Sequence, residues 1–328
     1  MRAAFYERTG PAHEVLQLAE LPDPQPGPGE VRVKLSHSGV NPSDVKSRAG
    51  LRSAQMPFAR VIPHSDGAGV IDAVGLGVHA RRIGERVWVW NAAWGRPNGT
   101  AAEYVCVPEQ HAVELPDGVA EDAAACFGIP ALTAAHAVLM GGGVAGKSVL
   151  VHGGAGAVGH YAIQFARALG AARVITTVSS EEKAQLAREA GATTVVDYKR
   201  ENVLEAVRAA THGIGVNRII EVDVAANAHV NLELVRAGGD WVVYGSGAPT
   251  FSLPFFPLIV KNLQLRFFIV YNLEAVDRAQ AHDTLHGLLA QGKLRHNIAA
   301  RMPLEKIADA HELVAQGKVA GNVVLQMG

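Results

Sequence analysis

Apolar and polar positions follow two different patterns along the chain, and the change between them lies near residue 120. The first part consists of short apolar segments separated by turn residues, which is typical of a mostly β domain. The proline-rich run at 22–29 is a surface connection, because proline lacks an N–H donor and fixes φ. The predicted strands of this part lie at residues 2–6, 16–21, 31–36, 69–74, 86–90 and 102–107.

A helical pattern begins near Glu121, with one helix that ends before Pro130 and a second helix after it. From Ser148 onwards, strands and helices alternate. This alternation requires crossover connections, which produce a parallel sheet covered by helices on both faces. The predicted strands lie at 148–152, 174–178, 194–196, 218–222 and 241–244, and the helices between them at 157–169, 181–190, 202–210 and 228–235.

The last part of the chain does not repeat this unit. A strand at 265–270 is predicted to close the sheet edge, and it is followed by helices at 275–291 and 304–316 and by strands at 294–300 and 323–326. We expect this tail to rejoin the first domain. The predicted domains are therefore residues 1–123 completed by 264–328, and residues 124–263.

Composition agrees with a folded enzyme of two domains. The chain has 328 residues, of which 48% are hydrophobic and 19% are charged. Its formal net charge is -1 and no dense Lys/Arg block occurs, so neither nucleic acid nor an anionic membrane surface is an expected partner. The amino-terminal segment lacks the apolar core of a signal peptide and no stretch is long enough to span a membrane, so we expect a cytoplasmic location. The two cysteines, Cys106 and Cys126, are too few for a disulfide framework.

A glycine-rich motif lies between the strand at 148–152 and the following helix. Gly154, Gly156 and Gly159 form a G-x-G-x-x-G pattern, with Ala157 and Val158 at the start of the helix. The first glycine permits a tight turn, the second lets the backbone approach a pyrophosphate, and the third lets the helix pack closely on the strand. Phosphates bound there face unpaired N–H groups and the positive end of the helix dipole. The motif therefore predicts a dinucleotide site.

The residues after the second strand of this domain favour NADPH over NADH. An NAD-binding fold carries an Asp or Glu about twenty residues past the glycines, but this position holds Ser179. Lys183 follows it, and Tyr198 and Arg200 follow the third strand. Hydroxyl groups and cations suit a 2′-phosphate. An alternative reading of Ser179 is a helix capping box with Glu182, and both readings are compatible.

Several motifs, in one order, resemble the zeta-crystallin-like quinone oxidoreductases of the medium-chain dehydrogenase/reductase superfamily. The resemblance implies an α/β fold with a Rossmann doubly wound parallel sheet plus a GroES-like, mostly β catalytic domain formed by both ends of the chain. It also implies NADPH and a homodimer or homotetramer. The motifs are GVNPSDVKSRAG at 39–50, IPHSDGAGVIDAVG at 62–75, GIPALTAAHAVL at 128–139, the glycine motif with its flanks at 148–171, IIEVDVAANAHVNLELVRAGGDWVVYGSG at 219–247, and PLEKIADAHELV at 303–314.

The same resemblance predicts that no metal is bound. Zinc-dependent alcohol dehydrogenases of the superfamily carry a Cys ligand in a C-G-x-C-H-T-D stretch and a His ligand in a G-H-E stretch. Asn41 and Ser65 stand at these positions here, and two cysteines cannot form the four-cysteine structural site. Without a Lewis acid, the site favours hydride transfer to a conjugated acceptor, a quinone or an enone, which is already electrophilic.

Three residues of the 39–50 motif are the catalytic candidates. Asn41 is expected to donate a hydrogen bond to the acceptor, although an Asn before a Pro is also a common turn residue. Asp44 either orients a neighbour or caps a helix. Arg48 attracts an anionic acceptor, contacts the cofactor, or is a solvated surface residue.

Further cofactor contacts are carried over from the family. Asn322 stands where many relatives have a basic residue. Phe268 and Val270 offer backbone amides to the nicotinamide carboxamide, or belong to a sheet edge or dimer seam. The remaining predicted positions are Thr133, Gly245 and Ser246.

The predicted function is that of an enzyme, an NADPH-dependent quinone reductase. An NADPH-dependent enone or 2-alkenal reductase is the first alternative, since it shares every residue named above but needs a proton delivered to carbon. The second alternative is a non-catalytic NADPH-binding protein, as the lens crystallins of this lineage suggest.

Overall fold

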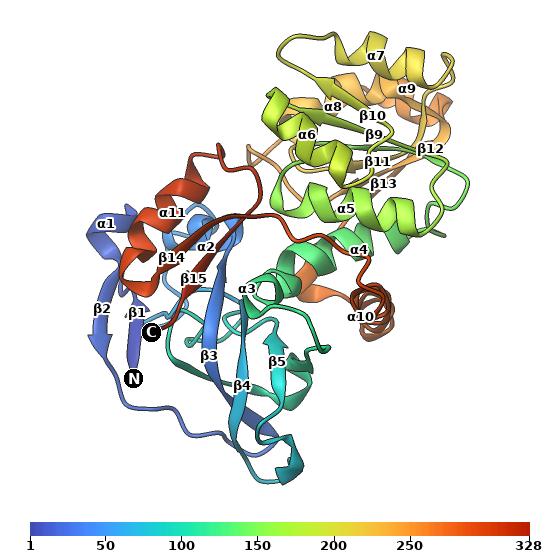
Figure 1. Cartoon of the computed structure of the whole chain (residues 1–328). Coiled ribbons are helices and arrows are strands. Elements are labelled where there is room, and N and C mark those ends of the chain that lie inside the picture. The colour runs from blue at the N-terminus through green and yellow to red at the C-terminus, as the bar shows by residue number, and fades with distance from the viewer. The chain divides into compact units, whose positions relative to one another are not determined.

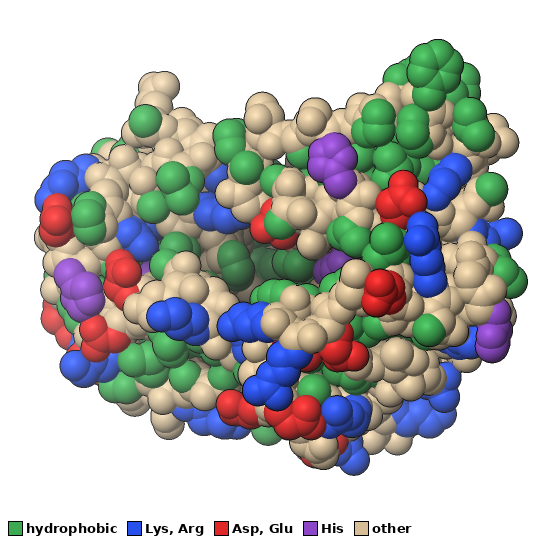
Figure 2. Space-filling model, turned by 90° about the horizontal axis from the view of Figure 1, so that it is seen from above, with side chains coloured by type: hydrophobic (Ala, Val, Ile, Leu, Met, Phe, Trp, Pro, Cys, Tyr) green, Lys and Arg blue, Asp and Glu red, His purple; other side chains and the backbone are tan.

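The computed structural model describes residues 1–328, which group into two compact units (Figure 1). Unit 1 consists of Met1–Ile129 and His296–Gly328, and unit 2 consists of Pro130–Arg295. Charged side chains of both signs are interspersed on the face seen in Figure 2. None of the helices is both long and apolar enough to cross a membrane.

Unit 1 is built on a seven-stranded, mostly antiparallel sheet in the order β14-β15-β3-β4-β5-β7, with β6 also paired to β3. Four short helices and a two-stranded sheet of β1 and β2 complete it. The strands are β1 (Arg2–Phe5), β2 (Gln17–Glu20), β3 (Glu30–Val40), β4 (Asp66–Val74), β5 (Arg86–Val89), β6 (Tyr104–Pro108), β7 (Ala112–Glu114), β14 (Ile298–Pro303) and β15 (Asn322–Gln326), and the helices are α1 (Ala12–Val15), α2 (Pro42–Arg48), α3 (Glu121–Ala124) and α11 (Ile307–Ala315).

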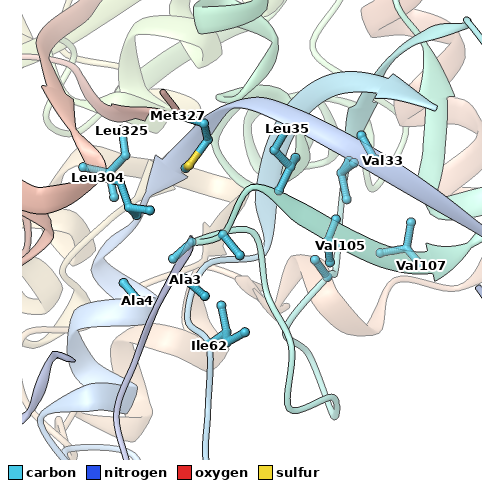
Figure 3. Close-up of a cluster of buried hydrophobic side chains, with 14 of the residues drawn as sticks. Ala3, Ala4, Val33, Leu35, Ile62, Val105, Val107, Leu304, Leu325 and Met327 are labelled. Atoms are coloured by element: carbon cyan, nitrogen blue, oxygen red, sulfur yellow. The ribbon is translucent and has the colours of Figure 1, made fainter. Parts of the chain in front are cut away.

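The carboxyl-terminal segment belongs to this sheet, as predicted. β15 pairs antiparallel with β3, with Val324 opposite Gly39, and β14 pairs parallel with β15. Apolar side chains from both ends of the chain form one core (Figure 3). Fully burying a Val or Leu side chain contributes ~1.5–3 kcal/mol, so the terminal segment is an integral part of the unit. The labelled members of this core are Ala3, Ala4, Val33, Leu35, Ile62, Val105, Val107, Leu304, Leu325 and Met327.

Unit 2 is the predicted Rossmann domain. Its six parallel strands lie in the order β10-β9-β8-β11-β12-β13, which is the 3-2-1-4-5-6 order of dinucleotide-binding sheets. In Figure 1, α4 and α5 lie on one side of this sheet and α7 and α8 on the other. The strands are β8 (Ser148–Val151), β9 (Arg173–Val178), β10 (Thr194–Asp197), β11 (Val216–Glu221), β12 (Val235–Val243) and β13 (Gln264–Phe267), and the helices are α4 (Leu132–Leu139), α5 (Ala157–Ala168), α6 (Glu181–Glu189), α7 (Val203–Ala210), α8 (Val224–Leu234), α9 (Phe255–Val260) and α10 (Ala275–Ala290).

Two predicted boundaries differ from the structure. Residues 264–295 lie in unit 2 rather than with the first domain, because β13 pairs with β12 and α10 packs against α4. Pro130 does not end a helix. It lies inside a π-helical turn, Phe127–Ala131, which continues directly into α4.

A buried ion pair inside unit 2 fixes α4 to the sheet. Arg218 of β11 is fully buried, and its Nε and Nη2 donate to the two carboxylate oxygens of Asp240 at 3.0 and 2.6 Å. Its Nη1 donates to the carbonyls of Ala137 and Val138 at the end of α4. Such bidentate, charge-assisted bonds are directional, so they set the position of the helix that carries Thr133.

Candidate functional site

The glycine turn between β8 and α5 brings backbone segments closer together than side chains allow. A Cβ atom on Gly154 would lie 2.1 Å from Thr176 Oγ1, and one on Gly159 would lie 2.2 Å from the carbonyl oxygen of Gly153. The positive φ of the turn, 70°, occurs at Gly153, which the motif does not include. A Cβ on Gly156 would meet only the Gly153 carbonyl, at 3.2 Å, so its outer side is open to a ligand.

The start of α5 is suited to an anion. Gly156 is the N-cap residue, and no side chain caps the helix. The first N–H groups of a helix have no intrahelical acceptor, and at this helix they belong to Ala157, Val158 and Gly159. Together with the helix dipole they form the kind of site that binds phosphate. The geometry thus fits a dinucleotide diphosphate.

Ser179 and Lys183 meet at the end of β9. Lys183 Nζ donates to Ser179 Oγ at 3.2 Å. The capping role proposed for Ser179 is taken by Ser180, whose hydroxyl accepts from the Lys183 N–H at 3.3 Å. The Ser179 hydroxyl and the Lys183 ammonium are therefore not used by the helix cap, and both suit a phosphate.

The charged and aromatic residues near Ser179 and Lys183 are compatible with a phosphate bound there. Glu181 is paired with Arg188 at 2.6 Å, so its charge is partly compensated. Tyr198 follows β10 and is 53% exposed. Its N–H donates to the carbonyl of Val178, which places the start of its loop beside the end of β9. Arg200, in the same loop, is exposed and lies 3.7 Å from Asp197.

Other predicted cofactor residues follow the ends of β12 and β13. A Cβ on Gly245 would lie 2.3 Å from the Val222 carbonyl, so this loop also needs glycine. Ser246 Oγ donates to the carbonyl of Ala248, and the Phe268 N–H donates to that of Val243. Since the strands are parallel, their carboxyl ends all lie on one side of the sheet. The loops after β12 and β13 therefore lie on the same side as the glycine turn.

Three predicted cofactor residues remain. Thr133 is buried in α4, and Val270 is buried just after β13. Asn322 belongs to unit 1, where its N–H and its side-chain amide both donate to the carbonyl of Asn297.

A buried polar network, which sequence reasoning missed, supports the glycine turn. The His152 ring bonds Thr177 Oγ1 at 3.1 Å and Asn231 Oδ1 at 2.7 Å. The Asn231 amide donates to Glu221, and the Gly153 N–H donates to Thr177 Oγ1. His152 directly follows β8 and Glu221 is the last residue of β11, and nothing in their local sequence indicates that they share partners.

Asn41 and Asp44 lie at the beginning of α2 in unit 1. Asn41 is the N-cap residue and forms a capping box with Asp44, whose carboxyl accepts from the Asn41 N–H at 2.8 Å. Burial raises the pKa of Asp44 to about 7. The Asn41 Nδ2 atom donates to Asp66 Oδ2 at 2.9 Å, although the sequence assigned no role to Asp66.

Arg48 is buried at the end of α2. Its Nη1 donates to the carbonyl of Gly10, and its Nη2 lies 4.0 Å from Glu312 Oε1. These contacts hold the guanidinium inside unit 1 and favour a packing role, so the catalytic role of Arg48 is a prediction that these contacts do not support.

The positions of the zinc ligands have no suitable side chains. Asn41 and Ser65 are both buried, and neither supplies the thiolate or imidazole that zinc prefers. The adjacent His64 uses both ring nitrogens, since Nδ1 bonds Ser38 Oγ and Nε2 bonds His311 Nε2, each at 2.9 Å. No group of three or more His, Cys, Asp or Glu side chains is arranged to hold a metal ion.

Comparisons with known proteins agree with this fold and site. The family model described as alcohol dehydrogenase GroES-like domain matches residues 27–117, and the one described as zinc-binding dehydrogenase matches residues 157–286. The quinone oxidoreductase of Homo sapiens is 32% identical over 315 residues, which cover 95% of this chain and 93% of that protein.

Two solved structures are similar over the whole chain. An NAD-dependent alcohol dehydrogenase has a TM-score of 0.91 and 30% identity, with all of both chains covered. The Escherichia coli quinone oxidoreductase in complex with NADPH has a TM-score of 0.88 and 25% identity, covering 99% of this chain and 100% of that chain.

The two-unit fold with its glycine turn defines a medium-chain dehydrogenase/reductase. Within this superfamily, the chain belongs to the quinone oxidoreductase family. The family resemblance seen in the sequence motifs is therefore confirmed.

The substitutions at the zinc-ligand positions generate the first prediction. After purification and dialysis against a chelator, we expect a zinc content near zero, because an amide and a hydroxyl replace the thiolate and imidazole ligands. Elemental analysis by mass spectrometry measures this, with a zinc-dependent alcohol dehydrogenase carried through the same dialysis as control. Zinc retained at one ion per chain would contradict the prediction.

Proposed function

We propose that this protein is an NADPH-dependent quinone reductase that works without a metal ion. The observation that carries the proposal is the carboxyl edge of the parallel sheet in unit 2. There a glycine cradle suited to a diphosphate lies beside a Ser/Lys pair suited to a 2′-phosphate. The family relationship, and a solved relative that binds NADPH, support the same conclusion.

The residues of unit 2 divide the binding of the cofactor among them. Gly154, Gly156 and the first N–H groups of α5 hold the diphosphate. Ser179 and Lys183, assisted by Tyr198, hold the 2′-phosphate. Bound NADPH supplies a hydride. An ionised carboxylate directly after β9 would repel the 2′-phosphate, and Ser179 avoids this repulsion.

Asn41 acts on the acceptor in this proposal. A quinone that accepts a hydride develops negative charge on oxygen, and an amide N–H aimed at that oxygen stabilises the charge. Conjugation spreads the charge over the ring, so a neutral donor is sufficient where an aldehyde needs a stronger Lewis acid. Asp44 serves by fixing the start of α2 through the capping box.

We also propose a cytoplasmic location and a homo-oligomer, a dimer or tetramer. Both cysteines are free and buried, as is usual in a reducing compartment. The outer edge of β13 is unpaired, and exposed apolar side chains lie on β13 and α9 nearby in the chain. Such edges and patches are typical of interfaces between subunits. The exposed side chains are Phe255, Phe256, Ile259 and Val260 on α9, Phe267 on β13, and Phe251 in the loop before α9.

Replacing Asn41 tests the acceptor role. The Asn41→Ala variant should lower kcat/KM for 1,4-benzoquinone by ~10- to 100-fold, because a donor to the developing oxyanion is lost, with NADPH affinity unchanged. NADPH oxidation and quenching of NADPH fluorescence measure the two quantities.

Asn41→Ser is the matched control, since serine keeps an N-cap oxygen but is too short to replace the amide. The Asn41→Ser variant should have the same low turnover as Asn41→Ala, and its melting temperature should equal that of the unchanged protein. Wild-type turnover in both variants would remove Asn41 from the reaction.

An alkenal is assayed beside the quinone to separate the alternative functions. Faster turnover of the alkenal would favour the enone reductase, and NADPH binding without any turnover would favour a binding protein.

Replacing Lys183 tests the cofactor assignment. Lys183→Ala should weaken NADPH binding by ~10-fold or more and leave NADH binding within ~2-fold, because only NADPH carries the phosphate that the ammonium contacts. Lys293→Ala, which removes one exposed lysine elsewhere in unit 2, is the charge-matched control. Equal losses for the two cofactors would contradict the assignment.

Replacing an exposed phenylalanine tests the oligomer. Light scattering after size-exclusion chromatography should show a dimer or tetramer, and Phe256→Glu should shift it towards the monomer, since a charge is costly in an apolar interface. Phe256 is 76% exposed in the single chain. Leu76→Glu, at a residue that is 82% exposed in unit 1, is the control and should not change the mass. A monomeric unmodified protein would refute the oligomer.

A further inference from the structure

Asp66 is a carboxyl group without the partners that a buried charge requires. It lies at the start of β4 and is fully buried. Its Oδ2 accepts a hydrogen bond from Asn41 Nδ2 at 2.9 Å, whereas Oδ1 has no hydrogen-bond partner of normal geometry, and the nearby Ile129 N–H is the weakest of the neighbours that lower the pKa of Asp66. Buried polar groups are nearly always satisfied, so an exception points to a function for the group.

The backbone around Asp66 leaves room for this carboxyl group. A Cβ on Gly128 would lie 2.6 Å from Asp66 Oδ1, and a Cβ on Gly39 would lie 3.1 Å from Asp66 Cβ. Gly39 is also the residue opposite Asp66 in the pairing of β3 with β4. Two glycines therefore create the space that the side chain occupies.

The hydrogen bonds of Asn41 can be counted. An Asn amide has one oxygen and two N–H donors. The oxygen accepts from the Asp44 N–H in the capping box, and one N–H is donated to Asp66. The second N–H is not bonded to Asp66. It lies within reach of the Asp44 carboxyl group, whose pKa burial raises and the Asn41 side chain lowers in part, and it is the N–H from which a ligand can accept a hydrogen bond. Because the terminal torsion of Asn is broad, the direction of this N–H depends on what holds the other amide atoms.

We propose that Asp66 is a positioning residue for the acceptor: its carboxyl group holds the Asn41 amide so that the second amide N–H faces the acceptor oxygen. This inference rests on the proposed function, in which Asn41 contacts the acceptor. Asp66 itself touches neither the acceptor nor the cofactor, and it forms and breaks no bond in the reaction.

The neutral form of Asp66 is the one that suits this task. Burial, and to a smaller extent the nearby Asp44, raise the pKa of Asp66 well above its ordinary value. An ionised Asp66 would be an uncompensated buried charge. In this proposal only the Asn41 amide separates Asp66 from the acceptor oxygen. An ionised Asp66 would therefore oppose the negative charge that develops on this oxygen during reduction. A protonated carboxyl group accepts the same hydrogen bond from Asn41 without this opposition.

Two variants of similar shape separate positioning from space filling. Asp66→Asn keeps an oxygen that accepts from Asn41, and it should retain kcat/KM for 1,4-benzoquinone within ~3-fold. Asp66→Leu fills the same space without an acceptor, and it should lower kcat/KM by ~10-fold or more with NADPH affinity within ~2-fold. Wild-type kcat/KM in Asp66→Leu would overturn the proposal. If Asp66→Leu does not fold, Asp66→Ser, which is too short to reach Asn41, replaces it with the same expected loss.

A double-mutant cycle with Asn41→Ala then tests whether Asp66 acts through Asn41. In the Asn41→Ala background, Asp66→Leu should cause no further loss of kcat/KM, because the group that it positions is already absent. Additive losses would overturn the inference and leave the proposed role of Asn41 intact. Wild-type turnover in Asn41→Ala alone would instead refute that role, so the two failures are distinguishable.

Discussion

The cofactor site depends on how closely the backbone of the glycine turn approaches its neighbours. Side chains at Gly154 or Gly159 would lie about 2 Å from other atoms, well inside any contact that real Cβ atoms make. This approach brings the first turn of α5 against the end of β8, so that its N–H groups line the edge of the sheet. Apart from Thr133, the other cofactor residues proposed in unit 2 lie in the segments that directly follow the strands, including the first turn of α6 with Lys183, and these segments share one side of the sheet because the strands are parallel.

The sequence predicts much of this architecture because the signals are local. A parallel strand covered on both faces is a short apolar run, and the spacing of the glycines directly reflects the turn that they form. The limits of the units are less predictable. The strand predicted at 265–270 does close the edge of the parallel sheet, as β13, but a helix such as α10 does not reveal which unit it packs on. The predicted domain boundary at residue 264 is therefore wrong, and residues 264–295 belong to unit 2. Pro130 likewise continues into α4 because a π-helical turn accommodates it.

Some buried polar residues have roles that the sequence does not reveal, because their hydrogen-bond partners are distant along the chain. Asp66 reaches Asn41 only because the pairing of β3 with β4 places it opposite Gly39. Arg218 resembles any polar residue in a strand until its bonds to Asp240 and to the end of α4 are seen. Residue type and local spacing carry no information about such contacts, which arise from the register of the sheet.

The two units use buried carboxyl groups behind their functional residues in contrasting ways. Glu221 accepts hydrogen bonds from the Asp223 backbone N–H and from the Asn227 and Asn231 side-chain amides, so both of its oxygens are satisfied by fixed donors beneath the glycine turn. Asp66 has one well-formed hydrogen bond, from Asn41, and a weaker contact with the Ile129 N–H, and these neutral donors do not compensate a buried charge. A carboxyl group with so few donors is tolerated in its neutral form, and in that form it orients an amide without opposing the charge that develops on a reduced acceptor. The number of donors around each group therefore accounts for how the same chemical group serves two different sites.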